Sequence, residues 1–427
     1  MNESKNIDEH DFDDVDDQDF SEDIPPSEGS MVKFIIKQLH FGMSLTNITL
    51  PTFILEPRST LERFMDWAVH GDLLRGTEKE PDPLIRCLRL CTWIVSGFHM
   101  GSLLPKKPYN SVIGEVYRAT VVDEKDDIIG CYVAEQVSHH PPITAFHYCD
   151  RKGNAIIWGH TEMRSKFYFN SIAALMEHEN TQVNYEIPSL GESYTFNFPN
   201  MYGKGILVGK MRMEIGGTVK IKCKKTNVKA KIVFLEKPLI GKKYNMFEGY
   251  IYQKNKKEPE ITFYGRWSAF MKAIDNRNGN VMIPFNVKTV LPLKIVNPPL
   301  SEQVDYESKK IWECVTHYLN EKDSFNATKH KHAIEEKQRK EEKYLEENGV
   351  PWELQLFHFD KDMNRYVPND LNLNPYDPNE PKQQMPSGFH IPNPIQQMLD
   401  NNLTKTFNEI HHETESNIQT DHHFVFN

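Results

Sequence analysis

The sequence has no apolar run that approaches the ~20 residues of a membrane-spanning helix. Its first residues are polar and acidic, so it also lacks the basic start and apolar stretch of a secretory signal. The six cysteines are scattered, and only Cys87 and Cys91 lie one helical turn apart, which leaves every zinc-site spacing incomplete. We therefore expect a cytoplasmic protein with reduced thiols and with no metal or other cofactor.

Signatures of catalysis are missing as well. The chain contains no Gly-x-Ser-x-Gly nucleophile elbow and no glycine-rich phosphate loop. Two adjacent histidines, His139 and His140, could in principle hold a metal or act as a base. No further ligands stand at a recognisable spacing, so we expect a binding protein and not an enzyme.

Negative charge is concentrated at one end of the chain. Residues 1–30 hold twelve acidic residues and one lysine, a net charge of −11, whereas the whole chain has −10. We expect this segment to be a disordered acidic tail on a nearly neutral body. Asp11–Asp17, with Phe12 as its one aromatic residue, weakly resembles a short motif that docks onto an endoplasmic-reticulum adaptor protein. A merely solvated tail is the alternative.

Helical periodicity precedes the central part of the chain. Apolar residues at positions 32, 35, 36 and 39 predict a short amphipathic helix, which is either docked core or a mobile lid over residues 31–50. Ser59 before an apolar run predicts a helix start, and Pro83–Gly97 predicts a second helix. These elements should form a small helical layer.

Residues 111–295 change to period two with frequent turn signals, which predicts an antiparallel meander. So many strands must close or pair their edges, and a large barrel leaves room for a ligand cavity. Residues 302–347 return to helix, with a break near Asp323–Asn326, and residues 350–427 are expected to be irregular and partly disordered. We therefore predict a mainly β (α+β) fold with flanking helices.

The segment Glu135–Pro142 lies between two predicted strands. Its two prolines hold a stiff extended backbone, and Pro141 keeps His140 out of the helical region. Two adjacent imidazoles could bind a phosphate without the cost of burying two permanent cations. Alternatively, both histidines only fill hydrogen-bonding positions at the end of a strand.

Three further polar groups are candidates for the same chemistry. Lys107 and Asn110 flank a stiff proline loop, which is either a phosphodiester site or a solvated loop. Ser165 could bind a small polar headgroup or cap a strand. On a helix, spacing of four keeps Lys331, Glu335 and Arg339 on one face, either as a salt-bridge ladder or as two cations presented to an anion.

A lysine-rich strand offers a basic surface. Lys220, Lys222 and Lys224 alternate with apolar residues, so period two places all three on one outer face. Such a face suits anionic membranes at ~1 kcal/mol per cation, or is simply solvated. Nucleic acid is not expected as a partner, because no stacking aromatics are interleaved.

Glu135–Pro142 is similar to the fingerprint of the oxysterol-binding-protein-related lipid-transfer family. Lys107–Glu115 resembles that family's Lys-Pro-x-Asn-Pro-x-Leu-Gly-Glu segment, with Ser111 in place of the second proline. Lys331–Arg339 resembles its late Lys/Glu/Arg segment. The order and spacing agree over residues 32–360.

The resemblance implies a large, nearly closed β-barrel with an N-terminal lid and C-terminal helices outside. Its tunnel would hold one lipid and exchange a cargo for phosphatidylinositol 4-phosphate at membrane contact sites. It predicts an acidic tail (1–30), a barrel domain with its lid (31–360) and a C-terminal extension (361–427). The residues implied for the phosphoinositide headgroup are Lys107, Asn110, His139, His140, Lys331, Glu335 and Arg339.

The cargo implied by the resemblance depends on the segment before the first helix. Residues 50–56 are similar to those of the branch that carries phosphatidylserine, and the implied cargo contacts are Leu50, Ile54, Lys107, Asn110 and Ser165. A sterol carrier is the second interpretation, and a lipid sensor or scaffold without net transfer is the third. Contact with anionic membranes would be peripheral and transient.

Overall fold

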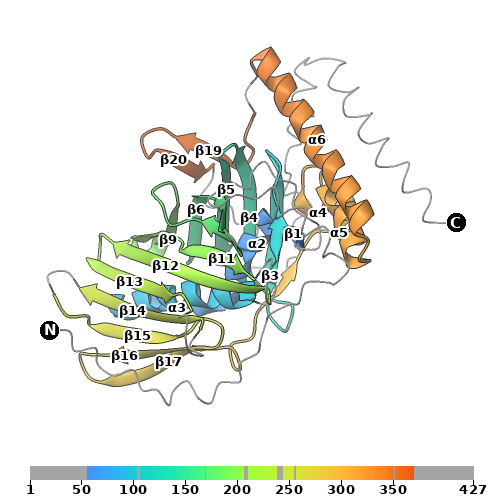
Figure 1. The fold of residues 1–427 in the computed structure, drawn as a ribbon. Helices are drawn as coiled ribbons and strands as arrows, with labels where there is room; N and C mark the ends of the chain where they lie inside the picture. The colour runs from blue at the N-terminus through green and yellow to red at the C-terminus, as the bar shows by residue number, and fades with distance from the viewer. Residues whose placement is uncertain are drawn as a thin grey trace.

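The computed structural model describes residues 55–102, 106–168, 170–205, 210–237, 244–253, 256–350 and 352–369 (Figure 1). Its main feature is one strongly curved antiparallel sheet of 16 strands. The predicted mainly β fold is therefore confirmed. The acidic tail, the lid, Leu50, Ile54 and residues 370–427 lie outside the described residues.

Thirteen strands form a continuous path, and most neighbours in space are neighbours in sequence, as a meander requires. The path runs β17 (Asn280–Asn286), β16 (Phe270–Asp275), β15 (Ile261–Arg266), β14 (Met246–Gln253), β13 (Val228–Leu235), β12 (Arg212–Cys223), β10 (Glu192–Phe196), β9 (Gln182–Ile187), β6 (Ile156–Glu162), β5 (Pro142–Asp150), β4 (Ile128–His139), β3 (Val116–Val122) and β18 (Lys294–Val296). A side flap joins β7 (Arg164–Tyr168), β8 (Ser171–Leu175) and β11 (Asn200–Lys204) to β12.

The two ends of the sheet, β17 and β18, do not pair with each other in the described part of the chain. The chain between β17 and β18 contacts the interior helices, where the Leu293 N–H donates to the Val69 carbonyl of η4 at 2.8 Å. The predicted nearly closed barrel is thus a curved sheet whose two ends remain unpaired in the described residues.

The predicted helical layer lies on the concave face of the sheet. Ser59 ends β1 (Leu55–Ser59) and caps α2 (Thr60–Phe64) in a capping box with Glu62. The 3-10 helices η4 (Met65–Leu74) and η5 (Thr77–Lys79) and the long helix α3 (Pro83–Ser102) follow. In Figure 1, α3 runs inside the curve of β12, β13 and β14.

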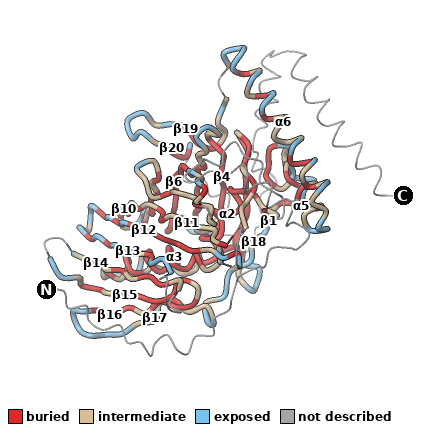
Figure 2. The backbone as a smooth tube through the Cα atoms, in the orientation of Figure 1, coloured by how far each residue is buried: buried red, intermediate tan, exposed pale blue. Residues whose placement is uncertain are grey.

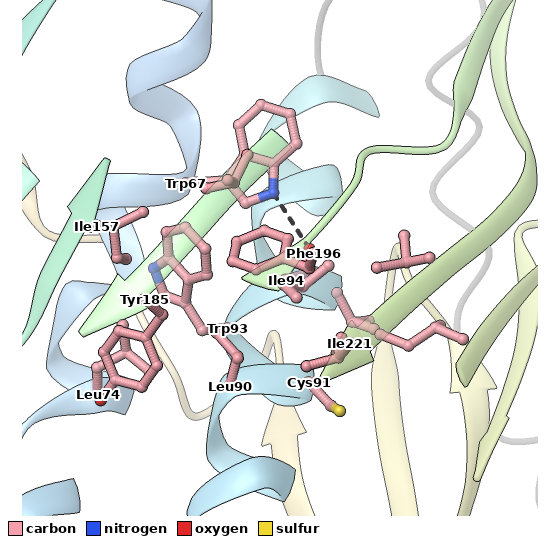
Figure 3. Close-up of a cluster of buried hydrophobic side chains, with 14 of the residues drawn as sticks. Trp67, Leu74, Leu90, Cys91, Trp93, Ile94, Ile157, Tyr185, Phe196 and Ile221 are labelled. Carbon is pink, nitrogen blue, oxygen red and sulfur yellow. Dashed lines mark hydrogen bonds between the residues drawn. The ribbon is translucent and has the colours of Figure 1, made fainter. Parts of the chain in front are cut away.

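The core fills the space between these helices and the sheet. Trp67 and Trp93 lie among apolar side chains from α3 and from inward-facing strand positions (Figure 3). The Trp67 indole N–H donates to the Ile94 carbonyl at 3.2 Å, so its one polar atom is satisfied. Each large apolar side chain buried here contributes ~1.5–3 kcal/mol.

The C-terminal helices pack on the outside, near β1 and the short strand β2 (Lys107–Tyr109). They are α4 (Ser308–Ile311), α5 (Glu313–Asn320) and α6 (Ser324–Asn348), and the 3-10 turn η7 (Leu300–Glu302) precedes them. The remaining 3-10 turn, η6 (Pro188–Leu190), connects β9 to β10. The predicted break is present, because Asp323 caps α6 by accepting from the Asn326 N–H at 3.0 Å. No helix in the described ranges is long and apolar enough to cross a membrane.

The expected change to irregular chain at residue 361 falls inside a hairpin. Strands β19 (Phe357–Asp360) and β20 (Arg365–Pro368) pair with each other over the outer face of the sheet. Val367 is buried against Trp158, and Arg365 stacks over the same ring at 4.5 Å. These tertiary contacts explain why local sequence pattern did not predict the hairpin.

Candidate functional site

A cavity opens between the sheet, the interior helices and α6. Phe64, Trp67 and Phe98 give it an aromatic wall, to which Met163, Met201 and Met213 add flexible apolar surface. Polar side chains from several separate segments also line it, among them Thr60, Arg63, Asp66, Lys106, Lys107, Asn110, Gln136, Thr144, Ser165, Tyr202, Lys331 and Glu335. An apolar cavity with a limited set of polar groups is the usual design of a small-molecule site.

Lys107 is held at this cavity by an isolated pair of parallel strands. In β1 and β2, Leu55 lies opposite Lys107 and Ser59 opposite Tyr109. Burial lowers the pKa of Lys107 to about 8, and the nearby Lys331 adds to this effect, whereas Glu335 opposes it. Lys107 is thus a desolvated cation with a second cation beside it.

The helix α6 supplies that second cation. Lys331 is buried and forms an ion pair with Glu335 one turn later, and both side chains line the cavity. Arg339 is exposed on α6 and does not line the cavity. The structure therefore brings together two members of the predicted triad with Lys107, although they are more than 200 residues apart in sequence.

The two histidines lie at the rim. His139 is half-buried, and its Nδ1 lies 3.0 Å from the carbonyl oxygen of Ser111, to which it donates in the corresponding tautomer. Its ring packs edge-on against that of His140 at 4.7 Å, and His140 is exposed. Burial chiefly lowers the pKa of His139, with His140 adding to this and Glu342 opposing it. Neither ring lines the cavity, but both lie beside residues 107–111, the segment that contains Lys107 and Asn110.

Gln136 and Thr144 are cavity residues that the sequence reasoning missed. Thr144 Oγ1 donates to Gln136 Oε1 at 2.8 Å, and Gln136 Nε2 donates to the Ser138 carbonyl at 2.9 Å. The signal was present, because period two from the interior residue Ala134 points Gln136 inward.

The expected cargo residues are only partly described. Asn110 and Ser165 are half-buried and line the cavity. Leu50 and Ile54 lie outside the described residues, but the next residue, Leu55, lines the cavity and pairs with Lys107. The chain therefore enters the described structure at the polar side of the cavity.

Two buried glutamates hold the motifs in place. Glu115 accepts hydrogen bonds from Ser308 Oγ at 2.6 Å and from the Trp312 indole at 3.0 Å, which ties the Lys107 segment to α4 and α5. Glu135 accepts the backbone N–H groups of Gln355 and Leu356, both at 2.8 Å. Burial raises the pKa of Glu135 to about 7. These carboxylates position the site and do not face the cavity.

A buried ion network stiffens the cavity wall, and the sequence reasoning did not find it. Arg63 Nη1 lies 2.7 Å from Glu56 Oε2, and Arg58 binds Asp66 through two hydrogen bonds of 2.6 and 2.9 Å. Two arginines face two carboxylates, so the network is neutral overall. Breaking one partner would leave a buried charge without compensation.

Comparisons with known proteins agree with this geometry. The family model described as oxysterol-binding protein matches residues 34–330. The chain is 34% identical over 363 residues to oxysterol-binding protein-related protein 8 of Homo sapiens, which covers 84% of this chain and 40% of that protein. It is 34% identical over 359 residues to oxysterol-binding protein 4 of Dictyostelium discoideum, covering 82% of this chain and 75% of that protein. The chain thus matches less than half the length of the human relative.

Solved structures share the fold. The Osh1 ORD domain in complex with cholesterol has a TM-score of 0.67 and 22% identity, covering 82% of this chain and 88% of that chain. The Osh3 ORD in complex with PI(4)P from Saccharomyces cerevisiae has a TM-score of 0.63 and 17% identity, covering 82% and 91%. With the family model covering most of the chain, the conclusion is direct: this protein belongs to the oxysterol-binding protein family.

Proposed function

We propose that this protein binds one lipid at a time in the cavity and exchanges a cargo lipid for phosphatidylinositol 4-phosphate between membranes, without catalysing a reaction. The proposal rests on one observation: two cations, Lys107 and Lys331, lie near each other and line an aromatic, apolar cavity together with Asn110. Two cations and an amide suit a phosphorylated headgroup, and the apolar wall suits its chains. The Osh3 domain, which shares the fold, was solved with PI(4)P.

The acyl chains and the headgroup of the bound lipid would contribute differently to binding. The chains contribute ~0.8 kcal/mol for each methylene removed from water, which favours extraction of any lipid of suitable length. The charged and polar groups then select the headgroup, because a buried cation without an anion is costly. His139 and His140 at the rim supply hydrogen-bond donors without a fixed charge. Arg339, on the same helix as Lys331, would attract the anionic headgroup from a longer distance.

Phosphatidylserine is the proposed cargo. Its headgroup carries a phosphodiester and a carboxylate, which fit Lys107, Asn110 and Ser165. The adjacency of Leu55 to Lys107 supports a role for the preceding residues: Leu50, which ends the proposed lid of residues 31–50, and Ile54. Because cargo and phosphoinositide share one cavity, binding of one excludes the other.

A sterol is the second candidate cargo. The wall of Phe64, Trp67 and Phe98 offers flat apolar surface, and the Osh1 domain of the same fold was solved with cholesterol. If Leu50→Asp abolishes sterol extraction and leaves phosphatidylserine extraction intact, the phosphatidylserine assignment is wrong. A sensor or scaffold would bind lipid stoichiometrically without net transfer, and turnover between vesicles separates it from a carrier.

The central test is lipid extraction and transfer between liposomes. We expect Lys107→Ala with Lys331→Ala to abolish phosphatidylinositol 4-phosphate extraction, and His139→Ala with His140→Ala to weaken it. The exposed pair Lys125→Ala with Lys152→Ala is the matched control and should behave as the unaltered protein. Normal phosphoinositide extraction by both site variants would refute the proposal.

A further inference from the structure

The outer face of β12 and β13 carries lysines directly opposite one another. In the register of these two strands, Lys220 pairs with Lys231 and Lys222 pairs with Lys229, and all four residues are exposed. Directly opposed positions on antiparallel strands place the Cβ atoms ~5 Å apart, and like charges at such positions are destabilising. We call these four residues the lysine face.

The fold fixes the lysine face firmly. The alternate residues Val219, Ile221, Ala230 and Ile232 are buried in the main core, so neither strand can rotate its lysines away. Among the described residues, no ion pair involves any of the four lysines. The repulsion between them is therefore not relieved by carboxylates of the folded body, and an anionic partner would relieve it.

Aromatic and polar side chains border this face. On β14, Tyr250 lies opposite Lys231 and Tyr252 lies opposite Lys229, and on β10, Thr195 lies opposite Lys222. Lys224 is exposed at the end of β12 and extends the positive charge. The one carboxylate that follows the same side of β14 is Glu248, two residues before Tyr250. The surface is basic, and its lysines are exposed to solvent.

The chain itself contains a segment whose charge is opposite to that of the lysine face. Residues 1–30 have a net charge of −11, and the remaining residues have about +1. A tethered segment has an effective concentration in the millimolar range, which favours it over free anions. With the predicted helix at residues 32–39, the linking residues 31–54 span up to ~65 Å, more than the ~50 Å diameter expected for a domain of this size.

We propose that the acidic segment 1–30 docks on the lysine face and thereby competes with anionic membranes for it. The contact goes beyond lipid exchange and lies on the opposite face of the sheet from the cavity, because the lysines alternate with the core-facing residues Val219 and Ile221. Lipid binding and membrane attachment would then be controlled by different surfaces of one domain.

Zero-length cross-linking of carboxylates to lysines in the full chain tests the contact. At low salt, we expect cross-links from residues 1–30 to Lys220 and Lys231, which decline when Lys222→Glu and Lys229→Glu are introduced and disappear at high salt, where charges are screened. The control Lys125→Glu with Lys152→Glu makes the same charge change on exposed loops and should leave them intact. Cross-links spread evenly over exposed lysines, or unaffected by the lysine-face variant, would overturn the proposal.

Sedimentation with phosphatidylserine vesicles tests the competition. Asp13, Asp14, Asp16 and Asp17 are changed to Asn in the full chain, and we expect binding to rise severalfold. Adding Lys222→Glu and Lys229→Glu should cancel that rise, whereas Lys125→Glu with Lys152→Glu should not. If neutralising the tail leaves vesicle binding unchanged, the lysine face serves membranes without competition and the proposal is wrong.

Discussion

At the scale of single residues, Lys107 combines two opposing requirements. Its ammonium group must be charged to attract a phosphate, yet it is desolvated and lies near Lys331. Burial and the like charge both favour the neutral amine, so its pKa falls to about 8. Bound phosphate reverses this balance, because an opposite charge stabilises the ammonium form.

This linkage predicts a pH dependence of binding. Above pH 8 the free protein loses the Lys107 proton and must recover it to bind the anion, so phosphoinositide affinity should fall by up to ~10-fold per pH unit. Lys107→Arg keeps its charge throughout, and its affinity should stay flat from pH 7 to 9. Vesicle extraction at fixed salt over this range is the measurement. Identical profiles for the two proteins would contradict the assignment.

At the scale of elements, α6 links the site to the body. Lys331 and Glu335 in its first half line the cavity, and the helix continues past the sheet with its outer side exposed (Figure 1 and Figure 2). Farther along, Glu341 is buried and accepts a hydrogen bond from the Tyr306 hydroxyl at 3.2 Å. Lys337 lies 4.0 Å from the same carboxylate. The docking of α6 therefore sets the position of the cations.

Glu341 predicts how this docking responds to pH. Burial raises its pKa from 4.5 to about 7, so the folded state binds the proton more tightly than the unfolded chain. The contribution of this group to the free energy of unfolding is fully present below pH 4.5. It is lost as the pH rises through 7, and the total loss is ~3 kcal/mol. Urea unfolding should find Glu341→Gln similar to the unaltered protein at pH 5 and more stable at pH 7.

The control for this measurement is Glu346→Gln, an exposed position on the same helix. Its free energy of unfolding should follow that of the unaltered protein at both pH values. An unfolding difference for Glu341→Gln that does not change between pH 5 and 7 would show that this carboxyl is not desolvated in solution.

At the scale of the whole molecule, one curved sheet around α3 creates both the core and the cavity. The aromatic residues Trp67 and Phe98 belong to the main core and also line the cavity, so the cavity is a gap in the core and not a separate surface cleft. Any lipid that enters must displace water from the same apolar wall. Extraction of different lipids should therefore share one steric requirement.

Filling the cavity should block every lipid at once. Ile172 on β8 lines the cavity, and Ile172→Trp adds bulk where lipid chains would lie. We expect loss of extraction for phosphatidylinositol 4-phosphate, phosphatidylserine and sterol in the liposome assay, with little change in thermal unfolding. Ile283→Trp, at a position 65% exposed, is the control. Selective loss of one lipid would indicate separate binding sites.

The sequence by itself determined the elements and most of the polar residues of the site. Period two with turn residues predicted the antiparallel strands, Ser59 marked a helix start and Asp323–Asn326 a break between helices, because these signals act over a few residues. The Lys107 segment, Lys331 and Glu335 were identified by resemblance to a family, and the cavity brings them together.

Only the tertiary structure decided what depends on contacts between distant segments. The burial that lowers the pKa of Lys107 and the buried network of Arg63 with Glu56 arise where strands and helices meet. The opposed lysines on β12 and β13 follow from strand register, and the hairpin β19–β20 forms because Trp158 and Val367 bury each other. Desolvation and register are properties of the packed chain, so no local pattern contains them.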